Sequence, residues 1–335
     1  MTIKDLSAQT GYSVGTISRV LNNQPNVSEK ARTAILAAAK ESGFQLNTNA
    51  KQLKQQHSNT ILVVVKGTSN ELFRNLVEAF QARMTSVAHP LIVDYMDEDD
   101  NEVLHALRLC REKKPMGVLF LGGNRQNFLA DFDKIGAPCV LVTNSASSMS
   151  FPNLSSVSSD DALAARTAID HLVSLGHRRI AVIGGDRNVS DTTKLRYQGC
   201  MEAFRNHSVD FDEELDYESV RFSYADGYKA AQNLVHRGRS FTALFAMSDV
   251  MAIGAIRALR DAGLRVPEDV SVMGFDGLTA GEYTVPRLST IMQDVRQLAD
   301  RSIEILLENI AQAHSPRYET VPIQVAWKES AKRVK

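Results

Sequence analysis

The chain has 335 residues, enough for two or three domains, and its 44% hydrophobic and 23% charged residues are typical of a globular protein. Its three cysteines are far apart and form no Cys-x-x-Cys pair, which argues against a disulfide framework or a cysteine zinc site. No apolar run is long enough to span a membrane and no signal-peptide core opens the sequence, so we expect a cytoplasmic protein.

The charge is unevenly distributed along the chain. Residues 1–56 hold seven Lys or Arg and three Asp or Glu, a net charge of +4, whereas the rest of the chain carries −5. A basic N-terminal part is suited to binding nucleic acid, because contacts with phosphates dominate that affinity.

Short helices separated by a Gly-containing turn are predicted at the N-terminus. Residues 2–5 form a capping pattern for the first helix, Gly11 breaks it, and Ser13 is a suitable N-cap for a second helix through Leu21. A third helix is expected from Ser28 to Ser42. The arrangement predicts a helix-turn-helix, with an ordinary helical hairpin as the alternative.

The second of these helices has two distinct faces. Its apolar face consists of Ile17, Val20 and Leu21. The opposite face carries small side chains and one long donor, namely Val14, Gly15, Thr16, Ser18 and Arg19. Small residues allow close approach to a DNA groove, and a guanidinium can pair with O6 and N7 of guanine.

From residue 60 onward, apolar strands and helical segments alternate. Strands are predicted at 61–65, 90–95, 117–121, 139–142, 179–183, 217–221, 243–246, 269–273 and 321–325. Helices are predicted at 70–87, 101–112, 126–135, 161–175, 192–207, 225–235, 249–262 and 298–311, with a loop at 144–156. This alternation predicts an α/β fold with two doubly wound parallel lobes, and a small-molecule site in the cleft between them.

Several motifs resemble the LacI–GalR family of bacterial regulators. In the N-terminal part they lie at 2–6, 13–22, 27–29 and 47–53, the last reading Asn-Thr-Asn-Ala-Lys-Gln-Leu. In the remainder they include His-Leu-Val-Ser-Leu-Gly-His-Arg-Arg-Ile-Ala at 171–181 and Val-Pro-Glu-Asp-Val-Ser-Val-Met-Gly-Phe-Asp at 266–276. Further matches lie at 195–199, 248–255 and 286–291. The resemblance covers nearly the whole chain in the family's order.

The resemblance implies a homodimeric, sequence-specific DNA-binding transcriptional regulator without a cofactor. We expect a repressor that binds a pseudo-palindromic double-stranded operator and is controlled by a sugar or sugar derivative. A ligand that strengthens operator binding, a co-repressor, is left open. The expected DNA contacts are Thr2, Ser13, Val14, Gly15, Thr16, Ser18, Arg19, Asn26, Asn49 and Leu53, with Leu53 as the family's wedge between base steps.

The domain organisation follows from the alternation and the resemblance together. We expect a helix-turn-helix domain at 1–46, a hinge at 47–59 and a two-lobed effector-binding and dimerisation domain at 60–335. The polar hinge is either a flexible linker or a segment that becomes helical only on DNA. The first lobe is expected at about 60–158 and 290–320, and the second at about 159–289 and 321–335.

Seven residues are predicted to bind the effector, and each has a plainer alternative. Asp276 follows a buried strand, where its carboxylate can accept from ligand hydroxyls or only cap a turn. The resemblance places Arg196 in the cleft, although it could be a surface ion-pair partner. The others could instead be helix caps or core aromatics, and they are Phe73, Asp160, Phe222, Ser248 and Asp249.

Nothing in the sequence indicates catalysis or a metal site. It has neither a Gly-x-Ser-x-Gly elbow nor a His-rich metal spacing. The acidic run at 97–101 is no EF-hand loop, since Glu102 and Arg108 stand where Gly and Glu are required. A sugar-binding protein or a sugar-acting enzyme on the same lobes is the alternative, but either would leave residues 1–56 without a role.

Overall fold

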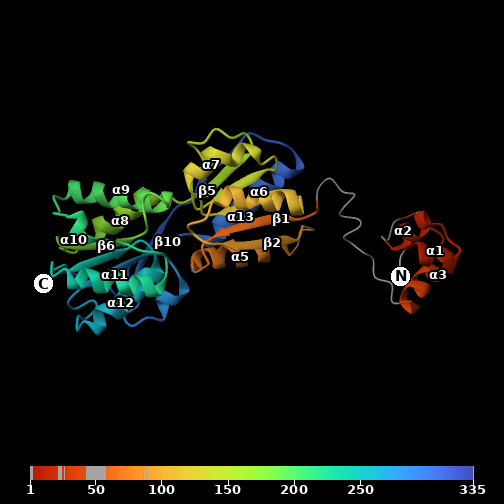
Figure 1. Cartoon of the computed structure of the whole chain (residues 1–335). Coiled ribbons are helices and arrows are strands. Elements are labelled where there is room, and N and C mark those ends of the chain that lie inside the picture. The colour runs from red at the N-terminus through yellow and green to blue at the C-terminus, as the bar shows by residue number, and fades with distance from the viewer. Residues whose placement is uncertain are drawn as a thin grey trace. The chain divides into compact units, whose positions relative to one another are not determined.

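The computed structural model describes residues 3–21, 25, 27–42, 58–68, 70–85, 87 and 89–334 (Figure 1). They belong to two compact units, Met1–His57 and Ser58–Lys335, and each is described by itself. In the described residues the first unit is helical and the second is α/β. The predicted hinge lies almost entirely outside the described residues.

Three short helices build the first unit: α1 (Ile3–Thr10), α2 (Val14–Leu21) and α3 (Glu29–Glu41). Gly11 ends α1 at φ +71°, a left-handed conformation that favours glycine, and its amide donates to Ser7 O at 3.0 Å. The buried sides of the helices meet in one core, made of Leu6, Ile17, Val20, Ala31, Ile35 and Ala39. This core fixes which face of α2 is left toward solvent, and the predicted helix-turn-helix is confirmed.

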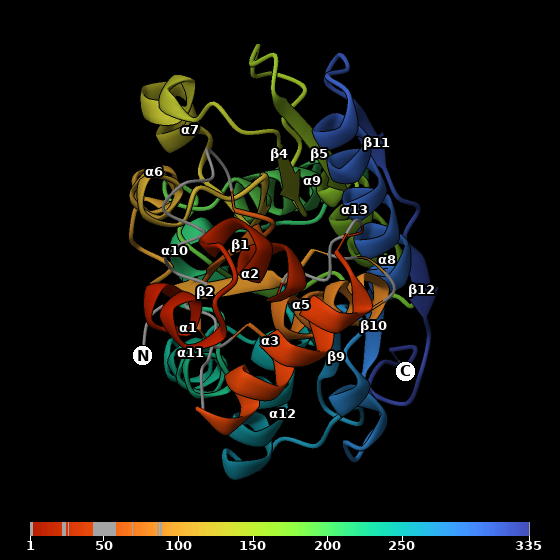
Figure 2. The ribbon, with the colours of Figure 1, turned by 90° about the vertical axis from the view of Figure 1, so that its right-hand side faces the viewer.

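The first lobe of the second unit is a parallel sheet in the order β11-β5-β4-β3-β1-β2. Its strands are β1 (Ile61–Lys66), β2 (Leu91–Met96), β3 (Gly117–Leu121), β4 (Cys139–Val142), β5 (Leu154–Ser158) and β11 (Tyr318–Thr320). On one face pack α5 (Glu71–Met84) and α13 (Val295–Ala311). On the other pack α6 (Glu102–Lys113), α7 (Arg125–Asp131) and the 3-10 helix η1 (Phe132–Lys134) (Figure 2). Helices on both faces explain why the inner strands are continuous apolar runs.

The second lobe repeats this plan in the order β12-β10-β9-β8-β6-β7. Its strands are β6 (Ile180–Gly184), β7 (Tyr217–Ser219), β8 (Ala243–Ala246), β9 (Ser271–Asp276), β10 (Ser289–Met292) and β12 (Gln324–Ala326). One face is covered by α8 (Asp161–Ser174) and α9 (Asp191–Asn206), the other by α11 (Tyr224–His236) and α12 (Asp249–Asp261). Short helices α10 (Glu213–Asp216) and η2 (Thr279–Glu282) lie in connections. The two predicted parallel lobes are confirmed, except that β12 runs antiparallel to β10.

The lobes lie side by side, and the chain passes between their sheets after β5, β10 and β11 (Figure 1). Strand β10 was not predicted, and because it pairs in the second sheet, the lobe boundary expected at about 290 lies a few residues later. The predicted loop at 144–156 is wrong at its end, where β5 begins. Of the strand predicted at 321–325, only the last part forms a strand, β12, because the chain changes lobes between β11 and β12.

Candidate functional site

A cavity of about 330 Å3 lies between the two lobes, at the carboxyl ends of their strands. Lys66 ends β1 and Thr143 follows β4 in the first lobe, while Gly185 follows β6 and Asp276 ends β9 in the second. The carboxyl ends of parallel strands are where open α/β sheets bind ligands, and the volume suits a small molecule. The cavity is therefore the candidate ligand site of the chain.

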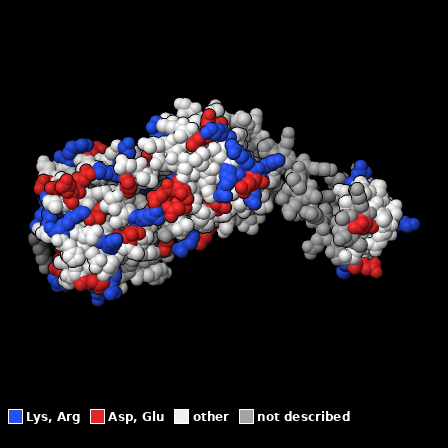
Figure 3. Space-filling view, in the orientation of Figure 1, with Lys and Arg blue, Asp and Glu red and all other residues white. Residues whose placement is uncertain are grey.

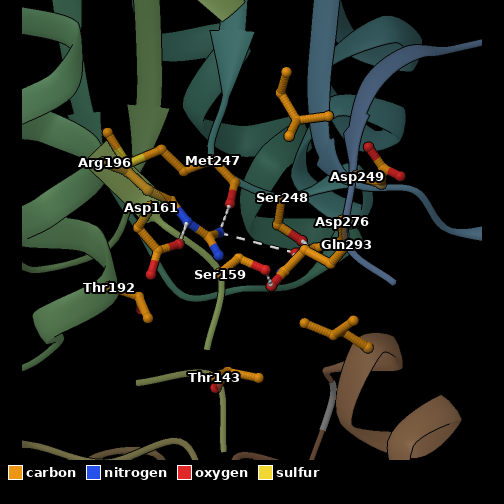
Figure 4. A network of polar contacts seen from close by, with 12 residues as sticks. Thr143, Ser159, Asp161, Thr192, Arg196, Met247, Ser248, Asp249, Asp276 and Gln293 are labelled. Atoms are coloured by element: carbon orange, nitrogen blue, oxygen red, sulfur yellow. Dashed lines mark hydrogen bonds and ion pairs between the residues drawn. The ribbon is translucent and has the colours of Figure 1, made fainter. Parts of the chain in front are cut away.

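Arg196 enters the cavity from α9 and is held by protein groups (Figure 4). Its Nε donates to Asp161 Oδ1 at 2.7 Å, and its Nη1 donates to the carbonyl oxygen of Met247. Its guanidinium carbon lies 3.6 Å from the ring centroid of Phe275. With only 4% of its surface exposed, the side chain is fixed in one orientation, and its unused N–H groups can donate to a ligand.

The carboxylate of Asp276 lies close to Arg196, with 3.9 Å between Asp276 Oδ1 and Arg196 Nη1 (Figure 4). Ser248 Oγ donates to Asp276 Oδ2 at 2.7 Å, and Gln293 Nε2 donates to Asp276 Oδ1 at 3.0 Å. Burial raises the pKa of Asp276 to about 6, against the lowering effect of Arg196 and of the two hydrogen bonds. Near pH 7 the group is an ionised acceptor in a largely buried site.

Two aromatic rings form apolar walls, Phe73 from the first lobe and Phe222 from the second. Each lies against a glycine that follows a strand. A Cβ added at Gly122 would lie 3.0 Å from the Phe73 ring, and one added at Gly185 would lie 2.8 Å from the Phe222 ring. The glycines after β3 and β6 thus make room for the rings, and rings with a few polar groups suit the apolar and hydroxylated faces of a sugar.

Lys66 lines the cavity and forms an ion pair with Glu102, which is fully buried. The distance from Lys66 Nζ to Glu102 Oε2 is 2.6 Å, and Nζ also donates to the carbonyl oxygen of Asp100 at 2.5 Å. Glu102 also accepts from the backbone amide of Asn124 at 2.6 Å and from Asn127 Nδ2 at 2.9 Å. The positive charge of Lys66 is thereby compensated by Glu102, which does not itself line the cavity.

At the rim of the cavity, residues 97–99 of the first lobe, here called the acidic loop, face Arg221 of the second. Arg221 Nη2 lies 3.2 Å from Asp97 Oδ1 and its Nε lies 3.4 Å from Glu98 Oε1, and it also pairs with Asp99. Figure 3 shows acidic and basic side chains next to each other on this face of the second unit. A hydrogen bond from Tyr224 Oη to Glu71 Oε1, at 2.8 Å, is a further link between the lobes.

The predicted effector residues divide into two groups. Phe73, Arg196, Phe222 and Asp276 line the cavity, whereas the other three do not. Asp160 is exposed and caps α8 by accepting from the amide of Leu163 at 2.9 Å. The hydroxyl group of Ser248 donates its hydrogen bond to Asp276. Asp249 is buried and accepts from the amide of Leu278 and from Thr290 Oγ1, both at 2.6 Å, so it joins α12 to β10 and to the loop that follows β9.

Sequence reasoning missed several lining residues, among them Lys66, Thr143 and Arg221, as well as the acidic loop. The sequence could have indicated most of them, because they stand at or just after the predicted carboxyl ends of strands, where α/β sheets bind ligands. The acidic run at 97–101 gives no sign of this contact in the sequence. Asn101 caps α6, whereas the carboxylates of the acidic loop reach Arg221 in the other lobe.

In the first unit, the predicted DNA-reading face of α2 lies away from the core. Val14 is 40% exposed and Arg19 is exposed, whereas Ile17 and Val20 are buried. Ser13 Oγ accepts from the amide of Thr16 at 3.1 Å, as expected of an N-cap. Gly15 is exposed and Ser18 half-buried. The remaining predicted DNA contacts lie outside the described residues, and they are Thr2, Asn26, Asn49 and Leu53.

Within the part of the chain that the structure describes, no helix is long and apolar enough to cross a membrane. Among the same residues, no group of three or more His, Cys, Asp or Glu side chains could hold a metal ion.

Comparison with known proteins adds family information. Residues 2–47 match the bacterial regulatory proteins of the lacI family, and residues 169–331 match a periplasmic binding protein-like domain. The HTH-type transcriptional regulator MalR of Clostridium butyricum is 33% identical, over 92% of this chain and 93% of that protein. The lac repressor bound to ONPG in its repressed state is 25% identical over 98% of this chain and 99% of its own, with a TM-score of 0.81. The complex of the regulator CelR with cellobiose is 26% identical over 98% and 99%, with a TM-score of 0.72.

Proposed function

Since the chain belongs to the lacI family of bacterial regulatory proteins and is a DNA-binding transcriptional regulator, we propose that it is a repressor controlled by a small sugar-like ligand. One observation carries the ligand site: buried Arg196 and Asp276 meet in a cavity bounded by both lobes. A ligand that touches both lobes can favour one relative pose over another. Such differential contact is what a ligand needs in order to shift a conformational equilibrium.

The chemistry of the cavity supports a polyhydroxylated ligand. Asp276 offers acceptor oxygens, Arg196 offers donors, and Phe73 and Phe222 offer ring faces. Among similar proteins, CelR has been seen with cellobiose and the lac repressor with ONPG, which is consistent with a sugar or sugar derivative. We assign no catalytic step to these residues.

For the DNA-bound form we propose a homodimer on a pseudo-palindromic operator in the cytoplasm. Residues 1–46 would read DNA, residues 47–59 would form the hinge with Asn49 and Leu53 as contacts, and residues 60–335 would bind ligand and dimerise. Tyr283 and Val285 of the second lobe are 83% and 82% exposed, and large apolar side chains that are so exposed favour a contact with another chain.

The test is a ligand screen followed by calorimetry. Thermal-shift screening of sugars, sugar phosphates and nucleosides identifies the effector, because binding to the native state raises apparent stability. The effector is then titrated into the protein with and without operator DNA, and linkage requires the same coupling free energy in both directions, typically about 1–3 kcal/mol. Asp276→Ala should abolish the response to the effector and leave operator binding intact, whereas exposed Asp133→Ala serves as the control.

Two outcomes would contradict the proposal. Unchanged effector affinity in Asp276→Ala would remove Asp276 from the site. If operator DNA leaves the effector affinity unchanged, the effector does not control DNA binding. Tighter effector binding with operator would instead identify a co-repressor.

A further inference from the structure

All three cations that line the cavity have carboxylate partners on the protein itself. The pairs are Lys66 with Glu102, Arg196 with Asp161, and Arg221 with the acidic loop. Two of these acids, Glu102 and Asp161, are buried behind the wall, with 0% and 3% of their surface exposed. The positive charges of the cavity wall are thus already compensated by acids of the protein.

Acidic side chains outnumber basic ones in the cavity wall. Glu98, Asp99, Asp186 and Asp276 line the cavity, so the wall and the acids behind it carry more negative than positive charge. An anionic ligand would meet this excess in a partly desolvated site, where repulsion is weakly screened. The same carboxylates are good acceptors for hydroxyl donors, and a neutral ligand meets no such repulsion.

We propose that the cavity selects an uncharged polyhydroxyl ligand and rejects its anionic derivatives, and that Glu102 determines this specificity by holding Lys66. This inference rests on the proposed function, because it concerns the ligand of the same site. Glu102 does not line the cavity and acts through Lys66, so it is a positioning residue.

Binding of an anionic ligand by Lys66 would disturb its ion pair with Glu102, and this cost supports the role proposed for Glu102. Lys66 Nζ already donates to Glu102 and to the carbonyl oxygen of Asp100, so a phosphoryl group that displaced these contacts would leave a buried carboxylate without its charge partner. Removing one partner from a buried ion pair is strongly unfavourable, whereas a hydroxyl ligand leaves the pair intact. The pair therefore acts as a charge filter in the wall of the site.

The first experiment uses full-length protein and inorganic phosphate as the probe, with sodium chloride at matched ionic strength as the reference. Wild type should show no phosphate-specific thermal shift. Glu102→Gln, which leaves Lys66 without its carboxylate, should gain a saturable shift. Because Glu102 accepts several hydrogen bonds, the folding of this variant is checked by circular dichroism.

A second variant does not depend on the buried pair. Asp97→Asn/Asp99→Asn removes two partners of Arg221 whose side chains are 51% and 60% exposed, so the fold should tolerate it. This variant should also gain phosphate binding. The matched control, Glu112→Gln/Asp133→Asn, makes the same charge change at exposed positions outside the cavity and should gain none.

The second experiment uses cellobiose and maltose, each with its 6-phosphate, as paired probes. Wild type should bind the neutral member of a pair, and both cavity variants should raise the affinity ratio of phosphorylated to neutral sugar at least about tenfold. Equal or tighter binding of the phosphorylated sugar by wild type would overturn the proposal, as would phosphate binding by wild type. Failure of folded cavity variants to gain phosphate binding would overturn the role of the paired acids. If neither disaccharide binds, cellobiose and maltose are excluded as effectors, whereas the phosphate experiment still decides the charge filter.

Discussion

Thr143 and Asp276 occupy equivalent places in the two lobes, at the carboxyl ends of β4 and β9, each the third strand of its sheet. Both have a positive φ, 74° for Thr143 and 116° for Asp276, and both line the cavity. Side chains other than glycine adopt such backbone conformations at a cost, and these residues tend to cluster at functional sites. The two lobes therefore turn their chains sharply at the same point and bring one polar side chain from each toward the cavity.

Asp276 should make stability depend on pH. Burial raises its pKa to about 6 from a usual value near 3.8, so between these values the folded state holds a proton that the unfolded state has lost. The contribution of Asp276 to the free energy of unfolding is fully present below pH 4. It is lost as the pH rises through 6, by up to about 3 kcal/mol. Asp276→Asn keeps the shape without the charge, so its stability relative to wild type should rise over this range. Urea denaturation at pH 4.5 and 7.5 measures the difference, and parallel pH profiles would contradict it.

Gln293 should carry information from the ligand site to the crossing segments. It donates to Asp276 Oδ1 at 3.0 Å and accepts from Ser159 Oγ at 3.1 Å, and the two residues Ser159 and Gln293 lie where the chain leaves β5 and β10 (Figure 4). Gln293→Leu fills a similar volume without these bonds. We expect reduced coupling between effector and operator, from a typical 1–3 kcal/mol to below about 1 kcal/mol, with effector still bound.

The measurement is effector titration with and without operator. Gln297→Leu, an exposed position on α13, is the control and should leave the coupling unchanged. Full coupling in Gln293→Leu would show that the lobes communicate by another route.

Two strands that sequence reasoning missed, β5 and β10, have buried hydroxyl side chains in place of an apolar run. In β5, Ser155 Oγ accepts from the amide of Arg317 at 3.1 Å, and Ser156 Oγ accepts from the amide of Ala146 at 2.9 Å. In β10, Thr290 Oγ1 donates to Asp249. These hydroxyls are buried because partners distant in sequence satisfy them, and hydrophobic patterning cannot detect such partners. The apolar runs of β1, β3 and β4 needed no such information and were predicted.

The candidate site, like the strands, was predicted only in part from the sequence. Strand ends and family resemblance indicated Asp276 and Arg196, which meet in the cavity. The same reasoning could not separate a cap from a ligand contact, because Asp160 and Asp249 have the sequence context of both. Nor could it find the partner of Lys66, because Glu102 follows a different strand and is brought to β1 only by the packing of α6.

Tyr283 should support self-association. Its ring and the side chain of Val285 are among the most exposed large apolar groups of the described residues. Tyr283→Asp places a charge on this surface and should weaken dimerisation at least about tenfold if the ring is buried between copies. Sedimentation equilibrium measures the association constant, with Leu129→Asp, a half-exposed apolar position on α7, as the control. An unchanged association constant would place the dimer contact elsewhere.

Arg19 should read a base and not merely a phosphate. Helix α2 packs into its core through Ile17 and Val20, which leaves Arg19 on the solvent side with Val14 and Gly15. Because the neighbouring side chains are small, the helix can approach a major groove closely enough for a guanidinium to reach a base edge. An operator selected from random DNA with wild type provides the reference sequence. Arg19→Ala should then cost about 1–3 kcal/mol and relax discrimination at one position of each half-site.

A residue that contacts only the phosphate backbone of DNA would have a different effect when it is replaced. Loss of a phosphate contact weakens binding to all sequences equally and makes the salt dependence shallower. Binding of Arg19→Ala and of the control Lys40→Ala, an exposed position near the end of α3, is therefore compared on the operator and on its single-base variants. A uniform loss in Arg19→Ala, with discrimination between bases unchanged, would show that Arg19 anchors the helix without reading the sequence.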